Sequence, residues 1–185
     1  MRILRRTAIA MVLSLATTGI VGVAPAQADI WIPPPTAGQV LAWYTLNSNN
    51  INDRKCVEVR DWRTDEGAPV SQYTCHWGHN QQWRLGFPTG NVFYLQNWNS
   101  GKCLEVPGGN LNYGVPTDQH SCTLGANQQW RMLWNSQHGF AQFQNVNSGM
   151  CLSVNGLSTA DFTAIVQNVC YALPNEQFHP VEVTP

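Results

Sequence analysis

The chain has 185 residues, a formal net charge of −1 at pH 7, and only 11% charged residues. This weak and mixed charge lacks the basic surface typical of proteins that bind nucleic acid or anionic membranes, so we exclude both kinds of partner. The length is sufficient for one well-buried domain.

The N-terminal 28 residues have the composition of a signal peptide. Three arginines (Arg2, Arg5 and Arg6) precede an apolar stretch from about residue 8 to 23, and small residues end at Ala28. This order predicts export with cleavage after Ala28, so the protein is expected to be secreted and extracellular. A membrane anchor is the alternative, which the short stretch and the cleavage pattern disfavour. Without these arginines, 7 Lys and Arg accompany 11 Asp and Glu, a net charge of −4, and no later apolar segment is long enough to span a bilayer.

Residues 29–42 are interpreted as an N-terminal arm or linker. Pro33, Pro34 and Pro35 are consecutive, which favours an extended, semi-rigid segment. Whether Trp31 packs on the domain is left open by the sequence.

The next 140 residues or so consist of three repeats. Asn-Gln-Gln-Trp occurs at 80–83 and again at 127–130, and a decayed copy ends at Phe178. Corresponding positions recur after 47 and then 48 residues. Such a period indicates one supersecondary unit used three times. We therefore predict a domain over 43–182, with repeats at about 43–86, 87–134 and 135–182.

The middle repeat has the clearest strand pattern. Four short segments, 92–97, 102–106, 117–122 and 129–133, are rich in β-forming residues and are separated by turns containing Gly, Asn or Pro. Four strands in each of three repeats predict an all-β fold of twelve strands. No segment shows sustained helical periodicity.

The six cysteines also follow the repeat. Each repeat contains two, 19 positions apart, and the second always lies 8 residues before the closing aromatic. Six cysteines allow 15 pairings, but three copies of one geometry favour pairing within each copy. The predicted disulfides are Cys56–Cys75, Cys103–Cys122 and Cys151–Cys170. Each closes a loop worth about 3 kcal/mol by chain entropy. Zinc ligation is the alternative, and it is disfavoured because closely spaced cysteine pairs are absent.

The aromatics that end the repeats are predicted to form the core. Short one-sided strands cannot bury their apolar faces alone, so the three copies should pack with Trp83, Trp130 and Phe178 at a shared centre. Gln82 and Gln129, beside these aromatics, are expected to form internal hydrogen bonds.

The chain resembles the ricin-type β-trefoil lectins, the group that includes carbohydrate-binding module family 13. The resemblance rests on the threefold repeat, the Q-x-W endings, the strands 56–59 and 103–106, the Gly-x-Pro segments at 67–69 and 114–116, and the paired cysteines. It covers essentially all of 43–182 and implies a pseudo-threefold trefoil with up to one shallow sugar site per repeat.

The family pattern also implies which residues bind sugar. A carboxylate lies two positions after the first cysteine, a stacking ring lies two positions before the second, and the Asn-Gln pair adds hydrogen bonds. The matching positions in the first two repeats are Glu58, Tyr73, Asn80, Gln81, Glu105, His120, Asn127 and Gln128. The third repeat has Ser153, Asn168, Asn175 and Glu176 at these positions. Because it lacks both the carboxylate and the ring, we expect it to be structural only.

Two of these assignments have alternatives. The family's carboxylate is usually Asp, whereas Glu58 and Glu105 are longer, and either could instead be a solvated strand residue. Trp62 could form a wall of the first site or pack against its own loop, residues 61–66.

Other chemistry has little support in the sequence. His76 and His79 lie three apart in a turn, without the helical i,i+4 spacing of a metal motif, so we predict neither a metal nor another cofactor. In a trefoil, Glu58 and Glu105 belong to different lobes, so we expect them to lie too far apart to act as the two carboxyl groups of a glycosidase. The sequence thus predicts a secreted, non-catalytic carbohydrate-binding protein for polysaccharide or cell-surface glycan. The alternative is a protein-interaction trefoil such as a protease inhibitor or a toxin-like subunit.

Overall fold

A computed structural model describes residues 40–45 and 54–183. The predicted signal peptide and most of the predicted arm lie outside the described residues. The first strand begins at Val40, so the last three residues of the segment interpreted as an arm belong to the sheet.

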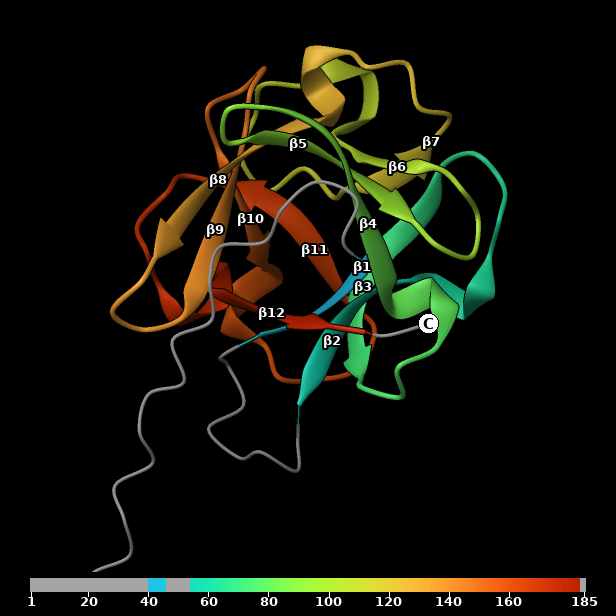
Figure 1. The fold of residues 1–185 in the computed structure, drawn as a ribbon, viewed down its shortest axis with the longest axis horizontal. Coiled ribbons are helices and arrows are strands. Elements are labelled where there is room, and N and C mark those ends of the chain that lie inside the picture. The colour runs from blue at the N-terminus through green and yellow to red at the C-terminus, as the bar shows by residue number, and fades with distance from the viewer. Residues whose placement is uncertain (1–39, 46–53, 184–185) are drawn as a thin grey trace, which may run out of the picture.

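The described residues form an all-β domain without an α-helix (Figure 1). The strands are β1 Val40–Thr45, β2 Lys55–Val59, β3 Ala68–Thr74, β4 Gln82–Thr89, β5 Val92–Asn97, β6 Cys103–Glu105, β7 Asp118–His120, β8 Gln129–Asn135, β9 Phe140–Asn145, β10 Cys151–Val154, β11 Thr163–Asn168 and β12 Phe178–Glu182. Short 3-10 helices join them: η2 Arg60–Trp62, η3 His79–Gln81, η4 Pro107–Gly109, η5 Ala126–Gln128, η6 Asn155–Leu157 and η7 Pro174–Glu176.

The strand pairings define a β-trefoil. Strands β1, β4, β5, β8, β9 and β12 pair in a closed ring, so they form a six-stranded barrel. The remaining strands form three hairpins, β2–β3, β6–β7 and β10–β11. The hairpins contact one another through β3–β7, β3–β11 and a bridge between Pro116 and Val166. The prediction of twelve strands in three repeats is confirmed.

The middle repeat shows how accurate the predicted boundaries are. β5 has the predicted bounds, whereas β6 and β7 are shorter than predicted and β8 continues to Asn135. β6 ends early because the chain turns into η4, where Gly108 and Gly109 both have positive φ. A left-handed backbone at two successive residues cannot continue a strand.

The core contains the residues that the repeat predicts. Trp83, Trp130 and Phe178 are at most 1% exposed, and the two indoles donate Nε1–H bonds to the Val57 and Leu104 carbonyls at 3.0 and 3.1 Å. A cavity of about 10 Å³ in this core has only apolar side chains around it. The amide side chains of Gln82 and Gln129 donate to backbone carbonyls, as predicted.

The three disulfides link the predicted pairs, one in each repeat, with Cα–Cα distances of 5.0 or 5.1 Å. Each joins the start of a hairpin to the loop that follows the hairpin. The disulfides therefore fix the loops beside the candidate sites.

Neighbouring repeats are connected by a set of buried amides that the sequence analysis did not single out. Gln72, Gln119 and Gln167 each lie three residues before the second cysteine and are fully buried. Gln119 Nε2 donates to two carbonyls of the loop before β3, both at 3.1 Å. Gln72 and Gln167 make the equivalent bonds to the loops of the third and second repeats. The sequence did contain a signal for these residues, because Gln recurs three positions before the second cysteine of every repeat.

Candidate functional site

Glu58 is the centre of the first candidate site. It lies near the end of β2 and is only 2% exposed. Its Oε2 accepts hydrogen bonds from Asn80 Nδ2 and Gln81 Nε2, both at 3.2 Å. His76 Nε2 lies 3.6 Å from the same oxygen. Burial raises the pKa of this carboxyl group, against the opposing effects of the Gln81 amide and His76. Glu58 is therefore not a solvated strand residue, and that alternative is wrong.

The two amides of the first site hold the carboxylate in place. Asn80 and Gln81, in η3, are at most 1% exposed. Asn80 Nδ2 also donates to the Val59 carbonyl at 3.1 Å. Gln81 Oε1 accepts the backbone N–H groups of His76 and Trp77 at 2.9 and 3.1 Å. The amides are thus positioned behind Glu58, where they fix its orientation; direct contact with sugar stays a prediction for them.

Two aromatic rings pack on His76, the imidazole beside the carboxylate. Trp62 stacks on the imidazole of His76, with 5.7 Å between ring centroids, and Tyr73 meets His76 edge-on at 6.0 Å. Trp62 also covers Gly78, because a Cβ placed there would lie 2.5 Å from Trp62 Cη2. Trp62 thus contacts residues outside its own loop, and its role as a wall of the first site stays a prediction. It remains 49% exposed, so part of the indole is available to a ligand.

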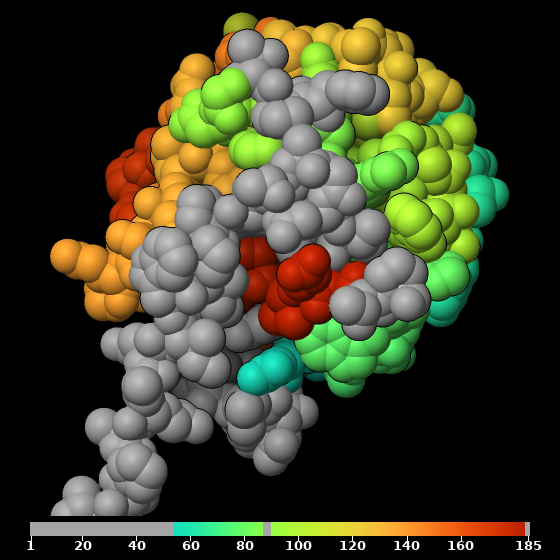
Figure 2. Space-filling model, viewed as in Figure 1, coloured from blue at the N-terminus to red at the C-terminus, as the bar shows by residue number. Residues whose placement is uncertain are grey.

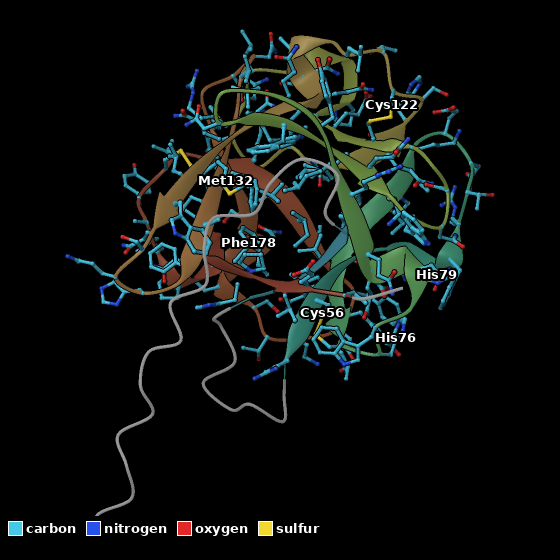
Figure 3. The ribbon with its side chains drawn as sticks, viewed as in Figure 1. Cys56, His76, His79, Cys122, Met132 and Phe178 are labelled. Carbon is cyan, nitrogen blue, oxygen red and sulfur yellow. A yellow bond between two sulfur atoms is a disulfide. The ribbon has the colours of Figure 1, made fainter. Side chains whose placement is uncertain are left out.

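His76 lies beside Glu58, a contact that the sequence analysis did not predict. The sequence suggests His76 only as a metal ligand together with His79. Both histidines lie in the segment between β3 and β4 (Figure 3), but only His76 has a contact with Glu58. In the space-filling view, side chains from around residue 80, in green, reach the surface beside the red C-terminal strand (Figure 2). The repeat pattern gave no signal for His76, because the equivalent residues of the other repeats are Thr123 and Tyr171.

The second site repeats the carboxylate and the amides. Glu105 is 8% exposed, so it too is buried rather than solvated. Its Oε2 accepts from Gln128 Nε2 at 2.8 Å and from Asn127 Nδ2 at 3.3 Å. His120, in the ring position on β7, is half-buried. Its Nδ1 lies 3.4 Å from Glu66 Oε2.

Two further acidic residues lie beside the second site. Asp118 is paired with Glu105 in the β6–β7 register. Burial, and secondly the charge of Glu105, raise the pKa of Asp118 to about 6. Hydrogen bonds from Lys102 and Ser121 instead lower the pKa of Glu66 to about 2. The sequence analysis missed Asp118 because the corresponding residues of the other repeats, Ser71 and Val166, are not acidic.

The third repeat keeps the frame and changes the chemistry. Ser153 replaces the carboxylate and accepts a bond from Asn175 Nδ2 at 2.8 Å. Glu176 is buried, and its Oε2 accepts from the Tyr171 backbone N–H at 2.8 Å. In the third repeat the acidic residue is thus on the 3-10 helix rather than on the strand, and its hydrogen bond fixes the loop after the second cysteine. Asn168, half-buried on β11, binds the backbone N–H of Val169 at 2.8 Å, so these residues all have structural partners.

Within the described segments 40–45 and 54–183, no group of three or more His, Cys, Asp or Glu side chains is arranged to hold a metal ion. Over the same residues, no helix has the length and apolarity needed to cross a membrane.

The fold and the repeated sites define the class of protein. The chain matches the family model of the ricin-type beta-trefoil lectin domain-like proteins over residues 37–120, 80–168 and 126–185. Because these matches span more than half of the chain, it belongs to this family. No curated protein sequence matches the chain.

Solved structures are similar over most of the chain. A designed threefold-symmetric protein, ThreeFoil, is 30% identical over 78% of this chain and 99% of its own, with a TM-score of 0.73. The ricin B-like lectin of Macrolepiota procera, solved with lactose, is 15% identical over 81% of this chain and 99% of its own, with a TM-score of 0.62. An exo-beta-1,3-galactanase from Clostridium thermocellum is 24% identical over 83% of this chain, with a TM-score of 0.72. This chain spans only 31% of the galactanase. At these identities, the lectin and the galactanase show the fold alone.

Proposed function

We propose that this protein is a secreted, non-catalytic lectin that binds polysaccharide or cell-surface glycan through its first two repeats. The observation that carries the proposal is the buried carboxylate of Glu58 next to His76, together with the rings of Trp62 and Tyr73 that pack on that histidine. A sugar presents hydroxyl groups together with an apolar face of C–H bonds, so it needs both an acceptor and a flat ring. Hydrogen bonds to an ionised acceptor are roughly twice as strong as neutral ones.

The surroundings of Glu58 support a binding role for the carboxylate. Its amide partners, Asn80 and Gln81, are neutral and use one oxygen, Oε2. Lys55, the cationic residue at the start of β2, is bound to Asp161 at 2.6 Å. The carboxylate is therefore positioned by two neutral amides and by the imidazole of His76, whose Nε2 lies 3.6 Å from the same oxygen.

Two sites on one rigid domain suit a polymer. Each site is small, but a chain or a surface that engages both raises avidity by about 10²–10⁴-fold when the geometry allows simultaneous binding. Glu58 and Glu105 belong to different hairpins, β2–β3 and β6–β7. This separation supports binding at two points rather than the paired carboxyl groups of glycoside hydrolysis.

The experiment is a pull-down on a panel of insoluble polysaccharides with matched variants. Glu58→Gln combined with Glu105→Gln removes both charges while keeping side chains that can accept from the amides. We expect this double variant to lose binding and Ser153→Ala, at the matched position of the third repeat, to retain it. Thermal unfolding checks that each variant is folded. Full binding by the double variant would contradict the site assignment. Capture of a protease or another protein, without polysaccharide binding, would instead favour the protein-interaction trefoil.

A further inference from the structure

The first site includes a ring that comes from a different repeat. Phe162, in the loop before β11, lies against Tyr73 with 4.8 Å between ring centroids. With His76 and Trp62, these side chains form a continuous row of rings, which we call the aromatic row. Phe162 is 42% exposed. The aromatic row therefore extends the surface of the first site beyond the part that one repeat supplies.

The backbone at Phe162 is unusual for such a large side chain. Its φ is +61°, in the left-handed region. The equivalent residues of the other repeats, Gly67 and Gly114, have φ of +71° and +75°. All three N–H groups donate to the carbonyl of the buried Gln in the next hairpin, at 2.8 or 2.9 Å. The turn is thus the same in each repeat and suits glycine. Only the turn beside the first site has an aromatic residue, in spite of the strained backbone.

The backbone is also left-handed at the opposite end of the aromatic row. Asp61 and Trp62 both have positive φ, at +54° and +57°. The second repeat has Gly108 and Gly109 at these positions. Trp62 and Phe162, the outer rings of the aromatic row, therefore both stand at left-handed positions where the second repeat has glycine.

A cationic group is fixed at the Phe162 end. The Arg60 guanidinium carbon lies 4.6 Å from the centroid of the Phe162 ring, and Arg60 Nε lies 3.4 Å from Asp61 Oδ2. Stacking on a ring orients a planar guanidinium and its N–H donors. Phe162 and Arg60 together offer a flat apolar surface for the C–H face of a second sugar residue and hydrogen-bond donors for its hydroxyl oxygens.

We propose that Phe162 and Arg60 form a second subsite, so that the first site binds consecutive sugar residues of one polysaccharide chain. This inference rests on the proposed lectin function and adds the length of ligand that the site recognises. One sugar lies at Glu58 beside Trp62 and Tyr73, and the next lies along Tyr73 toward Phe162. The second repeat has Pro107 and Gly67 at the positions of Arg60 and Phe162, so its site accepts a single sugar.

The test measures affinity against ligand length. The Glu105→Gln variant serves as the background, so that binding reports the first site. Calorimetry compares galactose and xylose with β-1,3-galacto- and xylo-oligosaccharides of two to six sugars. We expect affinity to rise about tenfold from the monosaccharide to the di- or trisaccharide of the recognised series, the effect of one added aromatic contact.

Phe162→Gly is the decisive variant, since glycine occupies this turn in the other two repeats and the fold should be retained. We expect it to abolish the gain with length, measured as the ratio of oligosaccharide to monosaccharide affinity in the same variant. Leu157→Gly is the matched control, because Leu157 is an exposed residue with φ of +56° in the third repeat. It should leave this ratio unchanged. A gain with length that survives in Phe162→Gly, or no gain in the background protein, would overturn the second subsite alone. If neither these sugars nor the polysaccharide panel binds, the proposed function fails, and the subsite with it.

Discussion

The first and third repeats have the same backbone and different chemistry. In both, an Asn of the 3-10 helix donates to a strand carbonyl, from Asn80 to Val59 at 3.1 Å and from Asn175 to Val154 at 2.8 Å. In both, the next side chain accepts the N–H of the loop after the second cysteine. These shared bonds build the trefoil. What differs is the strand residue, Glu58 or Ser153, and this difference separates the residues that make the fold from those that provide a site.

The two repeats also differ in which of two neighbouring positions, one on the strand and one on the 3-10 helix, has the acidic residue. The first repeat combines Glu58 with Gln81, and the third combines Ser153 with Glu176. A carboxylate at both positions would place two buried like charges together, whereas one carboxylate with one neutral partner does not. Each of these two repeats therefore has a single acid at the two positions compared, on the strand in the first repeat and on the 3-10 helix in the third.

The largest expected effect tests whether the repeats share one core. Trp83→Ala should lower the free energy of unfolding by about 3–5 kcal/mol, because a fully buried indole leaves a cavity. Trp83→Phe, which copies the residue of the third repeat, should cost less, since it loses mainly the bond to the Val57 carbonyl. Urea denaturation measures both. Equal losses for the two variants would show that the core does not tolerate the aromatic of the third repeat at the first.

The next prediction tests the exchange of acid and amide. Ser153→Glu alone should destabilise the protein by about 3 kcal/mol, because it adds a buried charge beside Glu176. Adding Glu176→Gln should recover most of that loss, since the third repeat would then have the pair of the first. The coupling free energy comes from a double-mutant cycle with denaturant. Additive losses would contradict the pairing rule.

A smaller effect concerns pH and the second site. The pKa of Asp118 is raised from 3.8 to about 6, so the folded state favours the protonated acid. Its stabilising contribution is therefore full below about pH 4 and is lost as pH rises through 6. Asp118→Asn should raise the free energy of unfolding by about 1 kcal/mol at pH 7.5, a figure reduced for its partial exposure, and should have little effect at pH 4. Thermal unfolding across this range measures it, and a gain that is equal at both pH values would rule out the titration.

The smallest effect on stability concerns the wall of the first site. Gly78→Ala would place a Cβ 2.5 Å from Trp62 Cη2 and 2.8 Å from His76 Cε1. Both rings are exposed and are able to move, so we expect stability to change by under about 1 kcal/mol and polysaccharide binding to fall severalfold. Glycine at 78 has an ordinary negative φ, so backbone strain does not contribute. Unchanged binding would show that the position of Trp62 is unimportant.

The repeat made much of this structure predictable. Cysteine spacing predicted all three disulfides, and the Q-x-W positions predicted the central aromatics, because a residue that occurs in each copy must serve the shared fold. Glu58 was assigned from the family resemblance, which implies a carboxylate two positions after the first cysteine. His76, Asp118 and Phe162 were not assigned, since each differs from its counterparts in the other repeats. Their roles depend on contacts across strands or between repeats, which linear spacing does not give.

The pairing of the first and last strands has a practical consequence. β1 and β12 are hydrogen-bonded neighbours from Leu41 opposite Glu182 to Thr45 opposite Phe178. Since β1 and β12 are barrel strands, whereas Glu58 and Glu105 lie on hairpin strands, a short peptide could link the two ends of the domain without crossing either candidate site. New termini could then be opened in the exposed turn at Gly90, between β4 and β5, to give a circular permutant in which the order of the repeats changes but their neighbours do not.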